Sequence, residues 1–95
     1  MFRAAVLASL LLAAPGVAAA HYQAEPVAKP AESKFVLRDT IWTCGEAGCA
    51  AGKSNSRPAI VCAVLAGKVG ALRSFSADGE ALDAAQLEKC NARAD

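Results

Sequence analysis

TCGEAGCAAGKSNSRP, residues 43–58, combines two cysteines, a glycine-rich turn and the sequence Gly52-Lys53-Ser54. Three interpretations fit this composition: a phosphate-binding loop, a metal site and a turn closed by a disulfide. A phosphate-binding loop needs a further glycine at the position that Ala47 occupies, and it must open a helix directly after a buried strand. Residue 47 is alanine instead of this glycine, and the two cysteines interrupt the loop that would connect strand and helix. We therefore expect no nucleotide site here.

Residues 1–20 have the layout of a secretory signal peptide. Arg3 supplies a positive start, residues 4–14 form an apolar run, and the alanines at 18–20 suit a signal peptidase. The apolar run is much shorter than the ~20 residues that cross a bilayer as a helix. We therefore predict cleavage after Ala20, no membrane insertion of the mature chain, and a periplasmic or secreted location.

The mature chain is close to electrically neutral. Of the ten lysines and arginines only Arg3 lies in the leader, which leaves nine basic residues against nine acidic ones. No run of like charges occurs among them, so the chain lacks the basic patch that binding to nucleic acid or to an anionic membrane requires. We expect neither as a partner.

Composition divides the mature chain into two parts. Residues 21–34 contain two prolines, alternate alanine with charged residues and show no hydrophobic period, which predicts a flexible linker. Residues 35–95 form the predicted folded domain. A unit of about 60 residues buries a modest fraction of its surface and commonly needs covalent cross-links.

Cys44, Cys49, Cys62 and Cys90 supply those cross-links. An even number of cysteines in a short exported chain indicates disulfides, because the compartment is oxidising. Three pairings can be drawn, and we favour Cys44–Cys49 with Cys62–Cys90. The first pair brackets a glycine-rich turn, and the second joins two predicted helices. Chain entropy assigns about 2 kcal/mol to the short loop and about 3.5 kcal/mol to the long one.

Hydrophobic patterning and turn signals predict a small α+β domain with the element order β-α-β-β-α. The expected elements are strands at 35–43, 71–77 and 80–82 and helices at 57–67 and 84–92. Ser56 and Asp83 are the expected N-caps, and Asp78-Gly79 is a hairpin turn signal. Residues 44–55 are expected to form a disulfide-closed loop, and the relative direction of the first two strands stays open.

The inventory of reactive side chains argues against catalysis. His21, the single histidine, falls in the predicted linker, so no serine of the domain has a histidine as its general base. The cysteines lack the Cys-x-x-Cys spacing typical of zinc sites and of thiol redox catalysis. An amino-terminal His21 could chelate copper through its imidazole and its amine, but we expect no further nitrogen ligand near it. We predict no enzyme activity, no catalytic residue, no metal site and no cofactor.

Several short motifs recur along the predicted domain. They are Trp42-x-Cys44, Cys49, Ser56-Arg57-Pro58, Val61-Cys62, Gly70-x-Leu72, Phe75, Gly79-x-x-Leu82 and Cys90-Asn91. This set resembles a family of short exported alphaproteobacterial proteins with four cysteines, and the resemblance covers residues 34–93. It implies export and a four-cysteine domain. It supplies no activity, ligand or catalytic residue to carry over.

These observations lead to a non-catalytic interaction module, a monomer that binds a protein partner of the cell envelope. Lys53, Asn55 and Arg57 are the residues that we expect to face this partner. The second hypothesis is an inhibitor of a periplasmic or secreted hydrolase that presents residues 44–58 to a cleft, and the third is a small metal-binding protein. Trp42 is expected to pack in the core, with an exposed anchor for a partner as the alternative.

Overall fold

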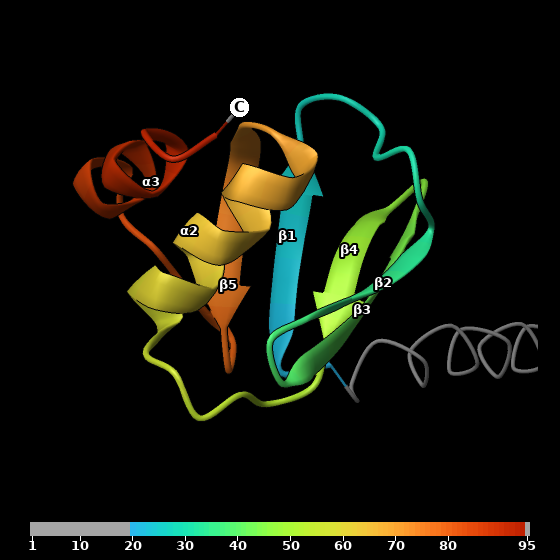
Figure 1. Cartoon of the computed structure of the whole chain (residues 1–95). Coiled ribbons are helices and arrows are strands. Elements are labelled where there is room, and N and C mark those ends of the chain that lie inside the picture. The colour runs from blue at the N-terminus through green and yellow to red at the C-terminus, as the bar shows by residue number, and fades with distance from the viewer. Residues whose placement is uncertain (1–19, 95) are drawn as a thin grey trace, which may run out of the picture.

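The computed structural model describes residues 20–94 as a six-stranded antiparallel sheet with two helices on one of its faces (Figure 1). The elements are β1 (Tyr22–Pro26), β2 (Lys34–Leu37), β3 (Thr40–Gly45), β4 (Gly48–Ala51), α2 (Pro58–Val69), β5 (Leu72–Ala77), β6 (Glu80–Ala81) and α3 (Ala84–Asn91). The strand order in the sheet is β2-β3-β4-β1-β5-β6. The α+β class is confirmed, whereas the predicted order β-α-β-β-α misses three of the strands. The predicted signal peptide lies outside the described residues, apart from Ala20.

β1 occupies the centre of the sheet, where the sequence predicts part of a flexible linker over residues 21–34. It pairs with β4 on one side and with β5 on the other. Tyr22 and Ala24 point into the core, whereas Gln23 and Glu25 point to solvent. This alternation has the period of a half-buried strand, but alanine and charged residues make it too weakly hydrophobic to recognise. The linker prediction is therefore wrong for β1.

The predicted first strand is in fact two strands joined by a tight turn at Arg38. In the β2–β3 hairpin Phe35 lies opposite Trp42, and both face the core. Val36 lies opposite Ile41, and both are exposed on the other face of the sheet. Arg38 turns the chain with a φ of 56°, in the left-handed region that non-glycine residues seldom occupy. A single strand over residues 35–43 would carry apolar groups on both of its faces. The turn at Arg38 divides the segment into two strands instead.

The chain after this hairpin is also strand where the sequence predicts a loop. β3 and β4 form a second hairpin in which Cys44 lies opposite Cys49. At Gly48 φ is 126°, and a Cβ atom there would lie 2.6 Å from the carbonyl oxygen of Ala24 in β1. Only glycine permits such a close approach of two backbones. The predicted loop of residues 44–55 is thus reduced to the segment after Ala51.

The core is built around three aromatic rings from three strands. Tyr22, Trp42 and Phe75 each expose 1% of their surface. The centroid of the Tyr22 ring lies 6.1 Å from that of Trp42 and 5.9 Å from that of Phe75. Leu65 of α2 and Leu72 of β5 are buried in the same cluster. The predicted packing role of Trp42 is confirmed, and the alternative of an exposed anchor is wrong.

α2 lies over the sheet and is one residue shifted from its predicted start. Arg57 occupies the N-cap position without a capping side-chain hydrogen bond, so the prediction of Ser56 as the cap is wrong. Pro58 opens the helix, where its missing N–H costs no intrahelical bond. Gly70 ends the helix with a φ of 93°, and its N–H donates to the carbonyl oxygen of Ala66 at 2.8 Å.

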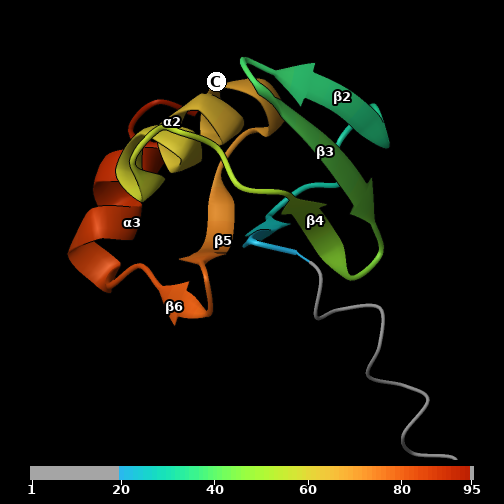
Figure 2. The same cartoon turned by 90° about the horizontal axis from the view of Figure 1, so that it is seen from below.

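α3 packs beside α2, as Figure 2 shows from below. Its predicted N-cap is confirmed, because the Asp83 carboxylate accepts a 2.8 Å hydrogen bond from the N–H of Gln86. The Gln86 side chain accepts in return from the N–H of Asp83 at 3.0 Å. This reciprocal pair is the capping box that fixes a helix start. Within residues 20–94 neither helix is long and apolar enough to cross a membrane.

Candidate binding surface

Both disulfides have the predicted pairing. Cys44–Cys49 joins β3 to β4 across the hairpin, with the two Cα atoms 4.0 Å apart. Cys62–Cys90 joins α2 to α3, with the two Cα atoms 5.7 Å apart. All four sulfur atoms are therefore bonded to one another in pairs. A zinc site of four thiolates, considered from the sequence, is incompatible with this pairing.

Lys53, Asn55 and Arg57, the predicted partner surface, are exposed on the loop that leads from β4 into α2. Ser54 lies between them and is buried, with 4% of its surface exposed. Its N–H donates to the hydroxyl oxygen of Tyr22 at 3.2 Å, and the Tyr22 hydroxyl donates to the Ser54 carbonyl oxygen at 3.4 Å. The loop is thus fastened to the central strand from beneath while its charged side chains stay outside.

Asp39 holds the same loop from the other side. Its carboxylate accepts hydrogen bonds from the N–H of Asn55 at 3.4 Å, the hydroxyl of Thr40 at 3.1 Å and the hydroxyl of Ser54 at 3.1 Å. The Asn55 N–H and then the two hydroxyl groups stabilise the charged form, which lowers the pKa of Asp39 below its ordinary value of 3.8. Asp39 therefore ties the β2–β3 turn to the loop before α2, a role that sequence reasoning missed.

His21 directly precedes the central strand β1 instead of lying in a flexible tail. Its N–H donates to the carbonyl oxygen of Ala51 at 3.0 Å, and its ring meets that of Tyr22 edge-on with the centroids 4.6 Å apart. The backbone nitrogen that the copper interpretation uses as a ligand is thus engaged in a hydrogen bond to the last residue of β4. In the part of the chain that the structure describes, no cluster of three or more histidine, cysteine or acidic side chains is placed to hold a metal ion.

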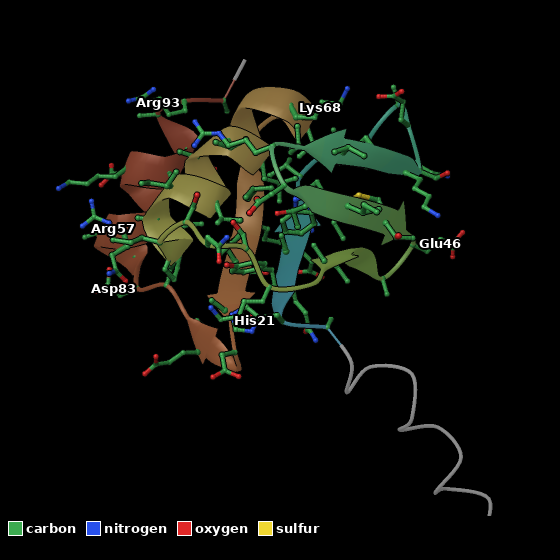
Figure 3. All side chains as sticks on the ribbon, turned by 60° about the horizontal axis from the view of Figure 1, so that its bottom comes forward. His21, Glu46, Arg57, Lys68, Asp83 and Arg93 are labelled. Atoms are coloured by element: carbon green, nitrogen blue, oxygen red, sulfur yellow. A yellow bond between two sulfur atoms is a disulfide. The ribbon has the colours of Figure 1, made fainter. Side chains whose placement is uncertain are left out.

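A groove runs along the outer side of the two helices, with a volume of about 690 Å³. Ala59, Ile60, Ala63 and Val64 of α2 form its apolar floor. Three cationic side chains line it, and they come from the β2–β3 turn and from α3: Arg38, Lys89 and Arg93. Figure 3 shows Arg93 and Arg57 on this helical side of the molecule, with Glu46 at the opposite end. Arg57 lines an adjoining hollow that shares two residues with the groove.

The cations of the groove form no ion pair with another residue of the described range 20–94. Among residues 20–94 one ion pair is formed, between Lys68 and Glu32 at 2.7 Å. Arg38, Lys89 and Arg93 take no part in it. The sequence did not reveal this groove, because Arg38 and the α3 cations are far apart along the chain and α2 brings an apolar stripe between them.

The face of the sheet opposite the helices is a second open surface. One row crosses all six strands there, in the order Lys34, Thr43, Ala50, Gln23, Ser76 and Ala81. A shallow hollow of about 580 Å³ lies over the central strands and is lined mainly by small side chains, with Glu25 as the one charged residue among the described lining residues. Val36 and Ile41 expose 64% and 56% of their surface toward the edge of this face. The sheet face therefore carries mainly small side chains and little charge, in contrast to the groove beside the helices.

The fold and these surfaces define a small disulfide-bonded α+β domain with one cationic groove and one open sheet face. The chain belongs to a family of unknown function, DUF8200, whose model matches residues 5–92. The match confirms that the chain is a member of an uncharacterised family, as the resemblance in its motifs implies. No curated protein and no solved structure matches the chain.

Proposed function

We propose that this protein is an exported, non-catalytic interaction module that binds a protein partner of the cell envelope through its surface. Export is supported by the signal-peptide layout of residues 1–20 and by two disulfides, which form and persist in oxidising compartments. The same two features support a periplasmic or secreted location.

The observation that carries the proposal is that the cysteines, Asp39 and Tyr22 have structural roles in the fold. The four cysteines cross-link the strands and the helices. The Asp39 carboxylate and the Tyr22 hydroxyl are both engaged in hydrogen bonds that fasten one loop. The outer surface of the domain has a groove and exposed charged side chains, and these features suit a binding protein.

Site-specific photo-crosslinking in living cells tests the proposal. The full chain is expressed with a photoreactive amino acid at Lys53, at Ile60 on the helical side or at Ile41 on the sheet face, all of which are exposed. We expect at least one position to give a defined protein adduct, identified by mass spectrometry, in the periplasmic fraction. If all three positions gave no adduct, or if the purified protein turned over a substrate, the proposal would be wrong.

The pinned loop before α2 favours a second candidate function, an inhibitor of a periplasmic or secreted hydrolase. Lys53 and Asn55 project on either side of Ser54, which Tyr22 and Asp39 hold from two directions. A loop held rigid in its exposed conformation loses little entropy on entering a cleft. Inhibition of lysozymes or proteases by the purified protein, abolished by substitution of Lys53 or Asn55 with alanine, would support this function over the first.

A further inference from the structure

We infer that the groove on the helical side binds an acidic peptide segment carrying aliphatic side chains, supplied by the protein partner. This inference rests on the proposed function and names the chemistry of the partner. The floor of the groove is apolar, and Ile60 exposes 36% of its surface there. An aliphatic side chain of a partner would cover this surface and remove it from water.

Charge complementarity identifies the rest of the occupant. Arg38 approaches the groove from the β2–β3 turn, whereas Lys89 and Arg93 approach it from α3. Among the residues that the structure describes, no carboxylate lines the groove, so three positive charges surround an apolar floor. Carboxylates of a bound segment would pair with these cations at its rim, which favours acidic partners and rejects basic ones.

Among residues 20–94, the acidic residues directly beside these cations in the sequence do not fill this role. Asp39 follows Arg38, but its carboxylate is directed to Thr40, Ser54 and Asn55. Glu88 precedes Lys89 on α3 and is not one of the residues that line the groove. With respect to residues 20–94, the cations of the groove therefore stay available to a partner.

The shape of the surface favours a peptide over an anionic membrane. A groove of about 690 Å³ encloses side chains, whereas a flat lipid surface would contact its rim alone. The mature chain has nine basic and nine acidic residues, so it has no general attraction to anionic surfaces. Binding should depend on the three cations together with the apolar floor.

A titration followed by NMR tests the inference. The ¹⁵N-labelled protein, purified with its disulfides after periplasmic expression of the full chain, is mixed with a synthetic peptide of about 12 residues in which leucines alternate with glutamates. A matched peptide carries glutamine in place of every glutamate. We expect the acidic peptide to shift the amide signals of residues 59–64 and 86–93, and to bind at least about tenfold more tightly than the glutamine peptide at low salt.

Charge reversal supplies the matched variants. K89E/R93E should weaken binding of the acidic peptide by roughly tenfold or more, whereas K34E, which reverses an exposed cation on the sheet, should leave it within about twofold. The conservative variant K89R should retain binding, which separates lost charge from a disturbed α3. Unchanged cooperative unfolding in urea shows that each variant is folded.

Three results of the peptide titrations would overturn the inference. They are equal binding of the two peptides, shifts confined to the sheet face, and equal losses in K34E and K89E/R93E. Binding of phosphatidylglycerol vesicles in preference to the acidic peptide would also overturn it, in favour of a membrane. Photo-crosslinking separates this failure from that of the proposed function: an adduct at Ile41 but not at Ile60 keeps the interaction module and places its partner on the other face.

Discussion

The hydroxyl group of Tyr22 both accepts a hydrogen bond from the N–H of Ser54 and donates one to its carbonyl oxygen, across a separation of 32 residues. A side chain of the central strand thereby fixes the backbone of the loop that leads into α2. Tyr22, which the sequence predicts to lie in a flexible linker, therefore anchors the loop that carries the predicted partner residues.

Tyr22→Phe should destabilise the protein by about 1–3 kcal/mol, because it keeps the ring in the core but leaves the buried N–H of Ser54 without its partner. Urea unfolding followed by tryptophan fluorescence measures the change. Ser74→Ala is the control, since it removes a hydroxyl from the exposed sheet face and should change the free energy of unfolding by less than about 0.5 kcal/mol. Equal effects of the two substitutions would contradict the role assigned to Tyr22.

The Cys62–Cys90 disulfide should contribute more stability than Cys44–Cys49. The two bonds close separations of 28 and 5 residues, for which chain entropy gives about 3.5 and about 2 kcal/mol. Replacing both cysteines of a pair with alanine should lower the urea midpoint further for the helix pair than for the hairpin pair. The opposite ranking would show that the hairpin disulfide does more than shorten a loop.

Gly48→Ala should disrupt the contact between β4 and β1. A methyl group there would meet the Ala24 carbonyl oxygen at 2.6 Å, and the φ of 126° is itself unfavourable for alanine. We expect a loss of at least about 1–3 kcal/mol in the free energy of unfolding. Gly45→Ala is the matched control in the same hairpin, because its added methyl group meets nothing within 4 Å. A loss of the same size in both variants would argue against the close approach of the two strands.

Stability should fall in acid through Asp39. Because its pKa in the folded protein lies below 3.8, its contribution is present above the unfolded value and is lost as the pH falls through the folded one. In Asp39→Asn the urea midpoint should fall less between about pH 5 and pH 2 than in the unaltered protein. Glu46→Gln, which alters an exposed carboxylate of the β3–β4 hairpin, is the matched control. Parallel curves for all three proteins would remove Asp39 from this role.

The disulfide pairing and the second half of the fold were predictable from local signals. Asp83 with Gln86 is a strong helix-start pattern, and Asp78-Gly79 marks the β5–β6 turn. The glycines between Cys44 and Cys49 indicate that the chain reverses there. Each of these signals acts over a few residues, so tertiary packing had little opportunity to override it.

The first half of the fold was not predictable in the same way. β1 owes its place to pairing with β4 and β5, since its own residues bury little apart from Tyr22. In the β2–β3 turn the residue with a positive φ is Arg38, where glycine or asparagine would be the usual signal. The sequence therefore gives no strong turn signal for this hairpin. The cationic groove likewise depends on three elements that meet only in the folded chain. The predicted partner residues Lys53, Asn55 and Arg57 are exposed, and their role stays a prediction.

The position of β1 determines how the sheet is held together. β4 and β5 each pair with β1 and not with one another, so β2–β4 and β5–β6 are two half-sheets that share one strand (Figure 1). A protease that cut after Pro26 and released residues 21–26 would leave those halves without a backbone ladder between them. Residues 21–26 are therefore the segment whose loss would separate the two half-sheets, although alanine and charged residues leave them with little hydrophobic pattern.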